Sequence, residues 1–398
     1  METIFRISGT GCALVDNLYK PVSFTDETFR RYLSVKPGDG GLSPGKLVFT
    51  EEFEQFSGEA YHIARKRITN GKQPVAQNIG GPSIVSLIHA AQMLYGLPAE
   101  VNFYGSKGHD QGGELIDELL TYTPLKIGQY KKVNQYTPFT DVLSDPDYDH
   151  GHGERIFINN MGAAWELKSD DLDKPFYQSN IVVFGGTALV PHIHRSLLQL
   201  LKKAKDYHVI TVVNTVYDFM SEKLDPTARW PMGESEETYQ YIDLLITDME
   251  EALRLSGQQT VEEALAFFNH AGAGAVIVTH GANPVHYYSQ SPFFGFTKGS
   301  KPVSAKIKEA LVQHPEKAGD TTGCGDNFVG GVIASIASQQ IVQPDVWPID
   351  FDEALALGIV SGGYACFYHG GTFIESYPGE KTDLIRPYYR DYLVHTSR

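Results

Sequence analysis

The sequence has few of the features that tie a chain to a membrane, to an oxidising compartment or to a structural metal. No apolar run of about 18 residues occurs among its 398 residues, so no segment is predicted to span a bilayer. The amino terminus lacks the basic and then apolar order of a signal peptide. Only three cysteines occur, far apart and without a CxxC pair, which argues against a disulfide framework and a zinc knuckle. We therefore expect a cytoplasmic protein.

Basic residues are also fewer than acidic ones. Lysine and arginine number 33 against 48 aspartates and glutamates, which gives a formal net charge of −15. Nucleic acid and anionic membranes are bound by dense basic surfaces, so neither is expected as a partner. A small anionic ligand stays compatible with this charge, because backbone dipoles can bind it locally. The Rossmann fingerprint and the GxxxxGK[ST] phosphate loop are both absent, so a bound nucleotide must be held by another device.

What the chain does contain is an alternation of short apolar runs with longer amphipathic segments. This alternation is typical of an α/β fold with a mostly parallel sheet that helices cover on both faces. The expected strands are 4–8, 101–105, 180–184, 208–213, 243–247 and 275–279. The expected helices are 82–95, 110–120, 192–205, 249–256 and 260–271. Two segments, 17–79 and 130–160, break the alternation, and we expect them to form a small β-lid over one edge of the sheet.

The most informative segment is AspThrThrGlyCysGlyAsp at 320–326, which leads into a run of small and apolar residues. Such an order predicts a loop that feeds the N-terminus of a helix. Gly323 and Gly325 allow consecutive N–H groups to point at one anion, such as a transferring phosphoryl group. Asp326 then lies at the mouth of the helix, where its carboxylate can accept the proton of a hydroxyl nucleophile. Carboxylates that merely cap turns are the alternative, but the compact order of glycines, threonines and carboxylates favours the functional interpretation.

This segment resembles the C-terminal signature of the PfkB/ribokinase family of carbohydrate and nucleoside kinases, whose usual form is DTxGAGD. Cys324 stands where alanine or glycine is common. The substitution is compatible with the motif, because binding an anion there needs only the backbone N–H group of this residue. The resemblance implies one ribokinase-like kinase domain over 1–398, with a three-layer α/β/α fold, that transfers a phosphoryl group from ATP with Mg²⁺ to an alcohol. The residues it implies here are Asp326 as general base, Gly323, Cys324 and Gly325 as anion hole, and Asp320 and Thr321 beside the nucleotide.

Two further segments resemble the substrate-binding side of the family. SerGlyThrGlyCysAlaLeuValAspAsn (8–17) resembles an opening strand whose terminal aspartate holds substrate hydroxyls, and Asp16 is its counterpart. AsnIleGlyGlyProSer resembles the family's glycine turn, in which Gly80 and Gly81 would let hydroxyls approach the backbone. The asparagine usual after these glycines is missing, since Val85 lies near its place. The structural alternatives are a turn residue at Asp16 and a packing turn at the glycines.

The nucleotide-binding side is matched at two further strand ends. AspLeuLeuIleThrAspMetGluGluAlaLeu resembles a strand followed by an NxxE helix start, with Asp248 in place of the asparagine and Glu251 as the glutamate. The resemblance implies that this pair organises Mg²⁺, largely through water, and a helix N-cap is the alternative. ValIleValThrHisGly resembles the strand end that lines the nucleotide, with Thr279 and Gly281 as counterparts. Residues 353–373 resemble the adenine and monovalent-cation region, so K⁺ is a further candidate cofactor.

The acceptor is left open by the sequence. A sugar is the first expectation, and a nucleoside is the alternative because the region 34–56 resembles adenosine-kinase-like members. A non-catalytic sensor that binds a sugar or a nucleotide is a third hypothesis, against which the intact Asp326 argues. Basic residues of the lid segments, such as Arg65 and Arg155, would recognise a substrate phosphate or simply solvate the surface. An exposed lid strand would also allow pairing into a homodimer.

Overall fold

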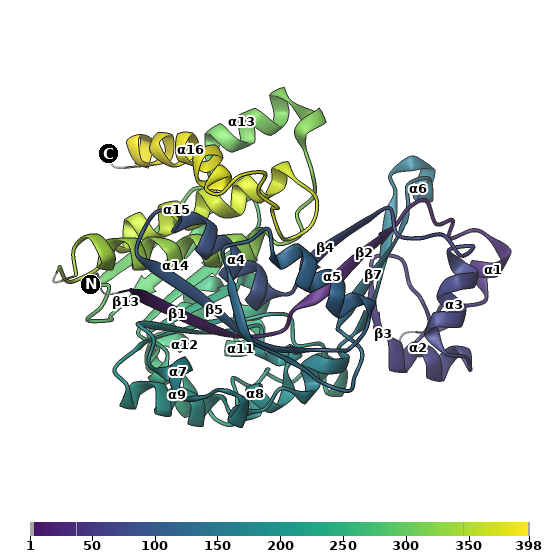
Figure 1. Cartoon of the computed structure of the whole chain (residues 1–398), viewed down its shortest axis with the longest axis horizontal. Coiled ribbons are helices and arrows are strands. Elements are labelled where there is room, and N and C mark those ends of the chain that lie inside the picture. Colours follow the sequence, from purple (N-terminus) through teal and green to yellow (C-terminus); the bar gives the residue numbers. More distant parts are fainter. Residues whose placement is uncertain (1–3, 37, 345, 397–398) are drawn as a thin grey trace.

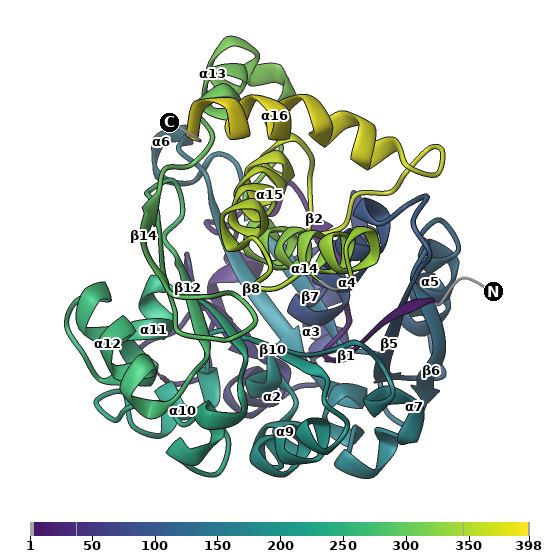
Figure 2. The same ribbon diagram turned by 90° about the vertical axis from the view of Figure 1, so that its left-hand side faces the viewer.

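The chain forms a larger and a smaller β-sheet (Figure 1, Figure 2). The structure, a computed structural model, describes residues 4–36, 38–344 and 346–396, so Pro37 of the 34–56 stretch lies outside it. The larger sheet contains, in spatial order, β14 (Thr297–Lys301), β13 (Val285–Ser289), β12 (Ala275–Thr279), β11 (Leu244–Asp248), β10 (Ile210–Asn214), β9 (Ile181–Gly185), β1 (Phe5–Gly11), β5 (Ala99–Lys107) and β6 (Lys126–Lys132). Neighbouring strands from β12 to β6 run parallel, while β13 and β14 add an antiparallel hairpin. The predicted mostly parallel sheet is confirmed.

Strands of the larger sheet are apolar on both faces because helices cover both. In β9, Ile181 and Val183 face one hydrophobic core, whereas Val182 and Phe184 face the other. Figure 1 shows the two helical layers on opposite sides of the sheet. The first layer contains α4 (Pro82–Met93), α5 (Gln111–Leu120), α13 (Ala305–Gln313), α14 (Cys324–Val342), α15 (Phe351–Tyr364) and α16 (Glu380–Thr396). The second contains α7 (Lys174–Tyr177), α8 (Pro191–Arg195), α9 (Leu197–Asp206), α10 (Phe219–Leu224), α11 (Met249–Ser256) and α12 (Val261–Ala271).

Each expected strand is present, as β1, β5, β9, β10, β11 and β12. The expected helices are also present, but the single helix over 192–205 is wrong. It is divided into α8 and α9 at Ser196, whose backbone (φ −92°, ψ 6°) leaves the helical region. None of the described helices is both long enough and apolar enough to cross a bilayer.

The smaller sheet combines strands from both segments that interrupt the alternation. Its spatial order is β3 (Leu47–Phe49), β8 (Glu154–Asn160), β7 (Phe139–Asp145), β2 (Leu14–Tyr19) and β4 (Ala76–Gly80). One face packs Leu143, Ile156 and Ile158 into a separate hydrophobic core with helices that the sequence analysis did not predict. These helices are α1 (Glu27–Arg30), α2 (Thr50–Ser57) and α3 (Tyr61–Ile68), and α6 (Tyr148–Gly151) lies between β7 and β8. In the opposite face, side chains such as Val142 and Phe157 are only half-buried.

Helix α14 lies between α4 and α15, and two adjacent glycines set its distance from each (Figure 2). A Cβ atom at Gly330 would overlap the Ser86 carbonyl oxygen of α4 and lie 2.9 Å from Cβ of His89. A Cβ atom at Gly331 would lie 2.5 Å from Oγ of Ser361 on α15. The close packing of these three helices therefore requires residues without side chains at both positions.

We expect Gly330→Ala to destabilise the fold by about 1–3 kcal/mol, because the added methyl group meets backbone that can move only if the helices separate. The midpoint of urea unfolding measures the loss. Gly128→Ala on β6 is the matched control, since a Cβ atom there would have no neighbour within 4 Å, and it should change stability by less than ~0.5 kcal/mol. Equal midpoints for the two variants would contradict the packing argument.

Candidate active site

The carboxyl ends of the parallel strands form one edge of the larger sheet. From β1 the chain adds β5 and β6 on one side, and from β9 it adds β10, β11 and β12 on the other. The direction of strand addition therefore changes between β1 and β9, the place where open α/β sheets bind ligands. At Gly11, at the end of β1 (φ 153°), a Cβ atom would overlap the Gly185 carbonyl oxygen and lie 2.6 Å from Cβ of Ser83. Only glycine at this position allows the start of α4 to pack closely against the ends of β1 and β9.

The N-terminus of α14 opens at the same edge. Gly323 is its N-cap in the left-handed region (φ 73°), and a Cβ atom there would lie 2.5 Å from Cα of Gly371. The N–H groups of Gly323, Gly325 and Asp326 have no protein acceptor among the described residues, whereas that of Cys324 donates to the Thr321 carbonyl at 3.3 Å. Free N–H groups at a helix N-terminus, together with the helix dipole, can bind an anion.

Two carboxyl groups, Asp326 and Asp16, interact electrostatically at this edge of the larger sheet. Burial raises the pKa of Asp326 to about 6. Burial also raises the pKa of Asp16 to about 7; a hydrogen bond from Thr140 acts against this, and the charges of Asp326 and Asp320 add to it. The structure thus brings together three of the carboxylates that the sequence analysis singled out.

Asp16 is not at the end of the opening strand, as expected, but three residues into β2. The chain leaves β1 and enters the smaller sheet directly, so the aspartate reaches the crevice from that sheet. Gly80 lies against it, since a Cβ atom at Gly80 would overlap the Asp16 carboxylate. Gly81 has a positive φ of 110°, and a Cβ atom there would lie 2.6 Å from the Cys12 carbonyl oxygen. Both glycines therefore allow close packing of β4 and α4 against residues 12–16.

A polar row crosses the same face of the smaller sheet. Asp16 on β2 pairs with Thr140 on β7, which in turn pairs with Asn159 on β8. Directly opposed residues of neighbouring strands share a face. Oδ1 of Asn159 is buried and has no hydrogen-bond partner among the described residues. The next row outward on this face is apolar and consists of Leu18, Val142 and Phe157.

The carboxylates at the end of β11 form a second acidic pair. Asp248 accepts a hydrogen bond from the Glu251 N–H at 2.8 Å and caps α11. Glu251 is buried and accepts a hydrogen bond from the Thr215 hydroxyl. Burial raises the pKa of Glu251 to about 8, and the charges of Asp248 and then Asp326 contribute to the shift. A cation near this pair would offset their mutual repulsion.

A mostly apolar cavity of about 340 Å³ adjoins the start of α14. It brings together the sequence-predicted residues Thr279, Gly281, Thr321, Cys324 and Gly325. Its apolar wall includes Val285, Val303, Ile307, Phe328 and Ile359. An apolar slot that ends at free backbone N–H groups suits a flat ring attached to phosphate groups.

A second cavity, of about 500 Å³, lies on the helix-covered face of the smaller sheet. It is lined by side chains that include Asn17, Tyr61 and Arg65. Asp141 beneath it accepts hydrogen bonds from Asn17 (2.8 Å), Tyr61 (2.7 Å) and Arg65 (3.3 Å). Because alternate residues of a strand face opposite sides, this cavity lies across β2 from the Asp16 carboxylate. Arg65 is therefore neutralised by Asp141 on the face away from the acidic crevice.

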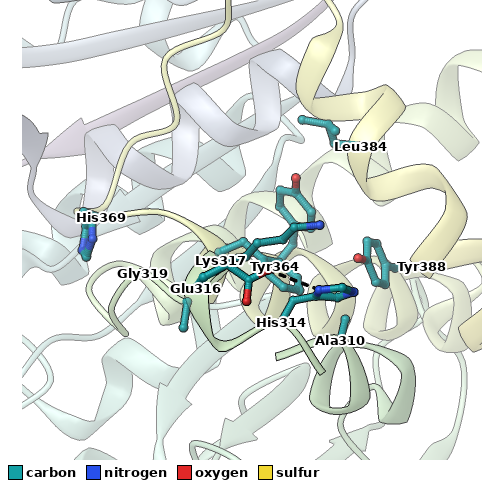
Figure 3. Close-up of a pocket in the computed structure, with 11 residues that line it drawn as sticks. Ala310, His314, Glu316, Lys317, Gly319, Tyr364, His369, Leu384 and Tyr388 are labelled. Atoms are coloured by element: carbon teal, nitrogen blue, oxygen red, sulfur yellow. Dashed lines mark hydrogen bonds and ion pairs between the residues drawn. The ribbon is translucent and has the colours of Figure 1, made fainter. Parts of the chain in front are cut away.

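A third cavity, of about 530 Å³, is lined by none of the predicted site residues. Figure 3 shows His314, Tyr364 and Tyr388 grouped at one end of it, with His369 on a loop at the other. Nδ1 of His314 lies within hydrogen-bond distance (3.2 Å) of Oε1 of Glu316 inside the cavity. The lining residue Gly319 directly precedes Asp320, and Nδ1 of His369 lies 3.6 Å from Oδ2 of Asp320, so this cavity borders the loop that leads to α14.

The chain matches the pfkB family of carbohydrate kinases over residues 55–376. It belongs to this family. The enzyme is accordingly a phosphotransferase that acts on an alcohol group. Probable fructokinase-5 of Arabidopsis thaliana is 23% identical over 296 residues, which cover 71% of this chain and 82% of that protein. Adenosine kinase of Schizosaccharomyces pombe is 24% identical over 311 residues, which cover 74% and 84%.

The fold of this pfkB family member is ribokinase-like. A putative ribokinase II from E. coli, solved in complex with ATP and Mg²⁺, superimposes with a TM-score of 0.63 at 17% identity and covers 98% of this chain and 100% of that one. The larger sheet and its two helical layers form the expected three-layer α/β/α arrangement.

Three polar residues near the candidate active site, Asn327, Lys381 and Asn214, were missed by the sequence analysis. The Asn327 side chain donates to the carbonyl groups of Gly323 (2.8 Å) and Gly371 (2.9 Å). It accepts from Nζ of the fully buried Lys381 at 2.7 Å. Asn214, at the end of β10, is buried with no partner for Oδ1 among the described residues. No local pattern marks these residues, because their neighbours in space are remote in sequence.

Lys381→Met should alter how the stability of this kinase depends on pH. Burial lowers the pKa of Lys381 to about 7, and Glu375 only partly opposes this. The folded chain thus binds this proton less readily than the unfolded chain, so wild-type stability should rise between pH 7 and about 10. Relative to Lys381→Met, the rise in unfolding free energy should reach at least ~1 kcal/mol, the equivalent of one pKa unit.

The exposed Lys72 supplies the control, since Lys72→Met removes a lysine charge without entering the buried network. Its stability difference from wild type should stay constant over the same pH range. A constant difference for Lys381→Met as well would show that Lys381 stays protonated on folding.

Proposed function

We propose that this kinase transfers the γ-phosphoryl group of ATP to a hydroxyl group of a sugar or sugar-like molecule, with Asp326 as the general base. The observation that carries the proposal is the position of Asp326 in the first turn of α14, beside the free N–H groups and near enough to Asp16 and Glu251 to affect both. Its charge raises the pKa of Asp16 on the acceptor side and that of Glu251 on the nucleotide side. A base near both can take the hydroxyl proton while the oxygen faces the phosphoryl group.

The smaller sheet supplies the acceptor side and acts as the lid. Asp16 and Thr140 present oxygen atoms that suit paired sugar hydroxyls, and the unpartnered Oδ1 of Asn159 extends the row. Asp326, with a pKa of about 6, is ionised at neutral pH yet basic enough to accept a proton. The free N–H groups of Gly323 and Gly325 then hold the charge on the phosphoryl group without reorganisation.

The nucleotide side fits ATP and Mg²⁺, the pair bound by the ribokinase II relative. The apolar cavity beside Thr279 and Gly281 takes the adenine ring, and Asp320 and Thr321 lie on the loop that leads to the phosphates. Asp248 and Glu251 would hold Mg²⁺ through water, because Mg²⁺ prefers oxygen ligands and keeps several of its waters. When bound, Mg²⁺ supplies positive charge that neutralises the phosphates.

The test of the base is Asp326→Asn, which keeps the shape of the side chain and removes its basicity. Turnover with ATP and a sugar acceptor should fall at least ~10²-fold, the scale of a lost general base. Nucleotide affinity, measured by calorimetry, should stay within a few-fold of wild type. Asp383→Asn, at an exposed aspartate of α16, is the matched control and should be fully active. Near-normal turnover in folded Asp326→Asn would reject Asp326 as the base.

A nucleoside is the second candidate acceptor, and one observation favours it. The row next to Asp16 on the open face of the lid is apolar, with Leu18, Val142 and Phe157 half-buried. A free sugar offers hydroxyl groups to the polar row but nothing apolar to the second row. The base of a nucleoside would contact that row while its ribose faced Asp16.

An acceptor panel with one lid variant separates the two candidates. Fructose, ribose and adenosine are each tested for ATP-dependent phosphorylation with wild type and with Phe157→Ala. For a sugar kinase, the truncation should change kcat/KM for the sugar by less than ~3-fold, because hydroxyl contacts come from the polar row. For a nucleoside kinase, kcat/KM for adenosine should fall at least ~10-fold, the scale of a lost aromatic contact. Sugar activity that falls equally would contradict the division of the face into two rows.

A further inference from the structure

Two cysteines far apart in the sequence meet at the nucleotide cavity. Sγ of Cys324, the first residue of α14, lies 3.5 Å from Sγ of Cys366. Cys366 belongs to a short 3-10 helix, Ala365–Phe367, and both cysteines line the 340 Å³ cavity. Neither is fully buried, so a small reagent that enters the cavity reaches both. The third cysteine, Cys12, is completely buried elsewhere.

The shared hydrogen bond makes the two thiols chemically unequal. It lowers the pKa of Cys366 to about 7, against the opposing effects of burial and of Asp320. The same bond, with burial, raises the pKa of Cys324. A thiolate is the nucleophilic form of cysteine, so Cys366 can attack first while Cys324 stands beside it as the resolving thiol.

We propose that Cys324 and Cys366 form a modification site, at which a small disulfide converts the two thiols into an intrachain disulfide that disables the nucleotide cavity. Cys366 Sγ attacks one sulfur of the reagent, forms a mixed disulfide and releases one thiolate. Cys324 Sγ then attacks the Cys366 sulfur and releases the second. Two protein thiols lose two electrons and two protons, and the reagent leaves as two thiols, so the exchange balances.

Because Cys324 lies in the turn at the start of α14, a disulfide between Cys324 and Cys366 would disturb that turn. The sulfur atoms must approach from 3.5 Å to the disulfide length of about 2.05 Å, a closure of roughly 1.5 Å. Cys324 lies between Gly323 and Gly325, whose N–H groups are free at the start of α14. On the other side, the Cys366 carbonyl accepts a hydrogen bond from the Gly319 N–H at 2.8 Å, so this segment is tied to the loop before Asp320. Closure therefore displaces the anion-binding turn, and a 1 Å misplacement of catalytic groups can cost about 10²-fold in rate.

The site is tested by treating the folded, reduced enzyme with hydroxyethyl disulfide. Mass spectrometry should show a chain lighter by two hydrogen atoms, and digestion should yield a peptide pair joined through Cys324 and Cys366. The kcat/KM for ATP should fall at least ~10-fold relative to the untreated enzyme and return after reduction with dithiothreitol. The effect on activity rests on the proposed kinase function, whereas the mass and the linked peptides do not. If the enzyme had no kinase activity, the mass and the linked peptides would still test whether the disulfide forms.

Three variants locate the chemistry, each compared with its own untreated sample. Cys366→Ser should keep its activity through the treatment and gain no intrachain bond. Cys324→Ala should retain the reagent as a mixed disulfide on Cys366, because no resolving thiol remains. Cys12→Ala should be oxidised and inactivated like wild type. Each of three results would overturn the proposal. They are a failure to link the two cysteines in folded wild type, equal inactivation of Cys366→Ser, and a disulfide that forms but leaves kcat/KM unchanged.

Discussion

One buried amide group, that of Asn327, fixes the N-terminus of α14, and the candidate active site depends on it. Its nitrogen donates to Gly323 and Gly371, and its oxygen accepts from Lys381 and from the Tyr368 hydroxyl at 3.0 Å. Leaving a buried polar group without a partner destabilises the fold. These hydrogen bonds therefore allow only one arrangement of three elements, namely α14, α16 and the loop that follows α15. The position of the free N–H groups at the start of α14 follows from that arrangement.

The same loop connects this turn to the smaller sheet. Asn78 on β4 donates to the carbonyl groups of His369 (3.0 Å) and Thr372 (3.1 Å), and the Thr372 hydroxyl donates to the Ile79 carbonyl (2.8 Å). Gly80 follows directly and lies against Asp16. A continuous series of hydrogen bonds therefore sets the distance between Asp16 and Asp326, although these residues belong to different sheets. Their electrostatic coupling follows from this connection.

The sequence predicted well what is encoded locally. Six strands of the larger sheet were found because each is a short apolar run bounded by turns, whereas β6, β13 and β14 were not predicted. The start of α14 was found because its glycines and carboxylates are consecutive. Helices α2 and α3 were missed because they are short, and their apolar faces pack only on the smaller sheet. Lys381 and Asn214 were missed because a buried polar side chain looks ordinary until its surroundings, distant in sequence, are known. The register that aligns Asp16 with Asn159 likewise depends on long-range strand pairing.

The two faces of the smaller sheet explain why family membership leaves the acceptor open. On one face, Leu143, Ile156 and Ile158 pack with α1, α2 and α3, so substitutions there would cost stability. On the other, residues such as Val142 and Phe157 are half-exposed and support little of the core. Because strand side chains alternate between faces, the set that we propose faces the substrate can change while the packed set stays constant. The turn at the start of α14, which we propose binds the phosphoryl group, has no such freedom, since its groups are backbone N–H groups held by a buried network. The sequence therefore identifies phosphoryl transfer through a turn that has little freedom to vary. The acceptor depends on side chains of the smaller sheet, which are free to vary.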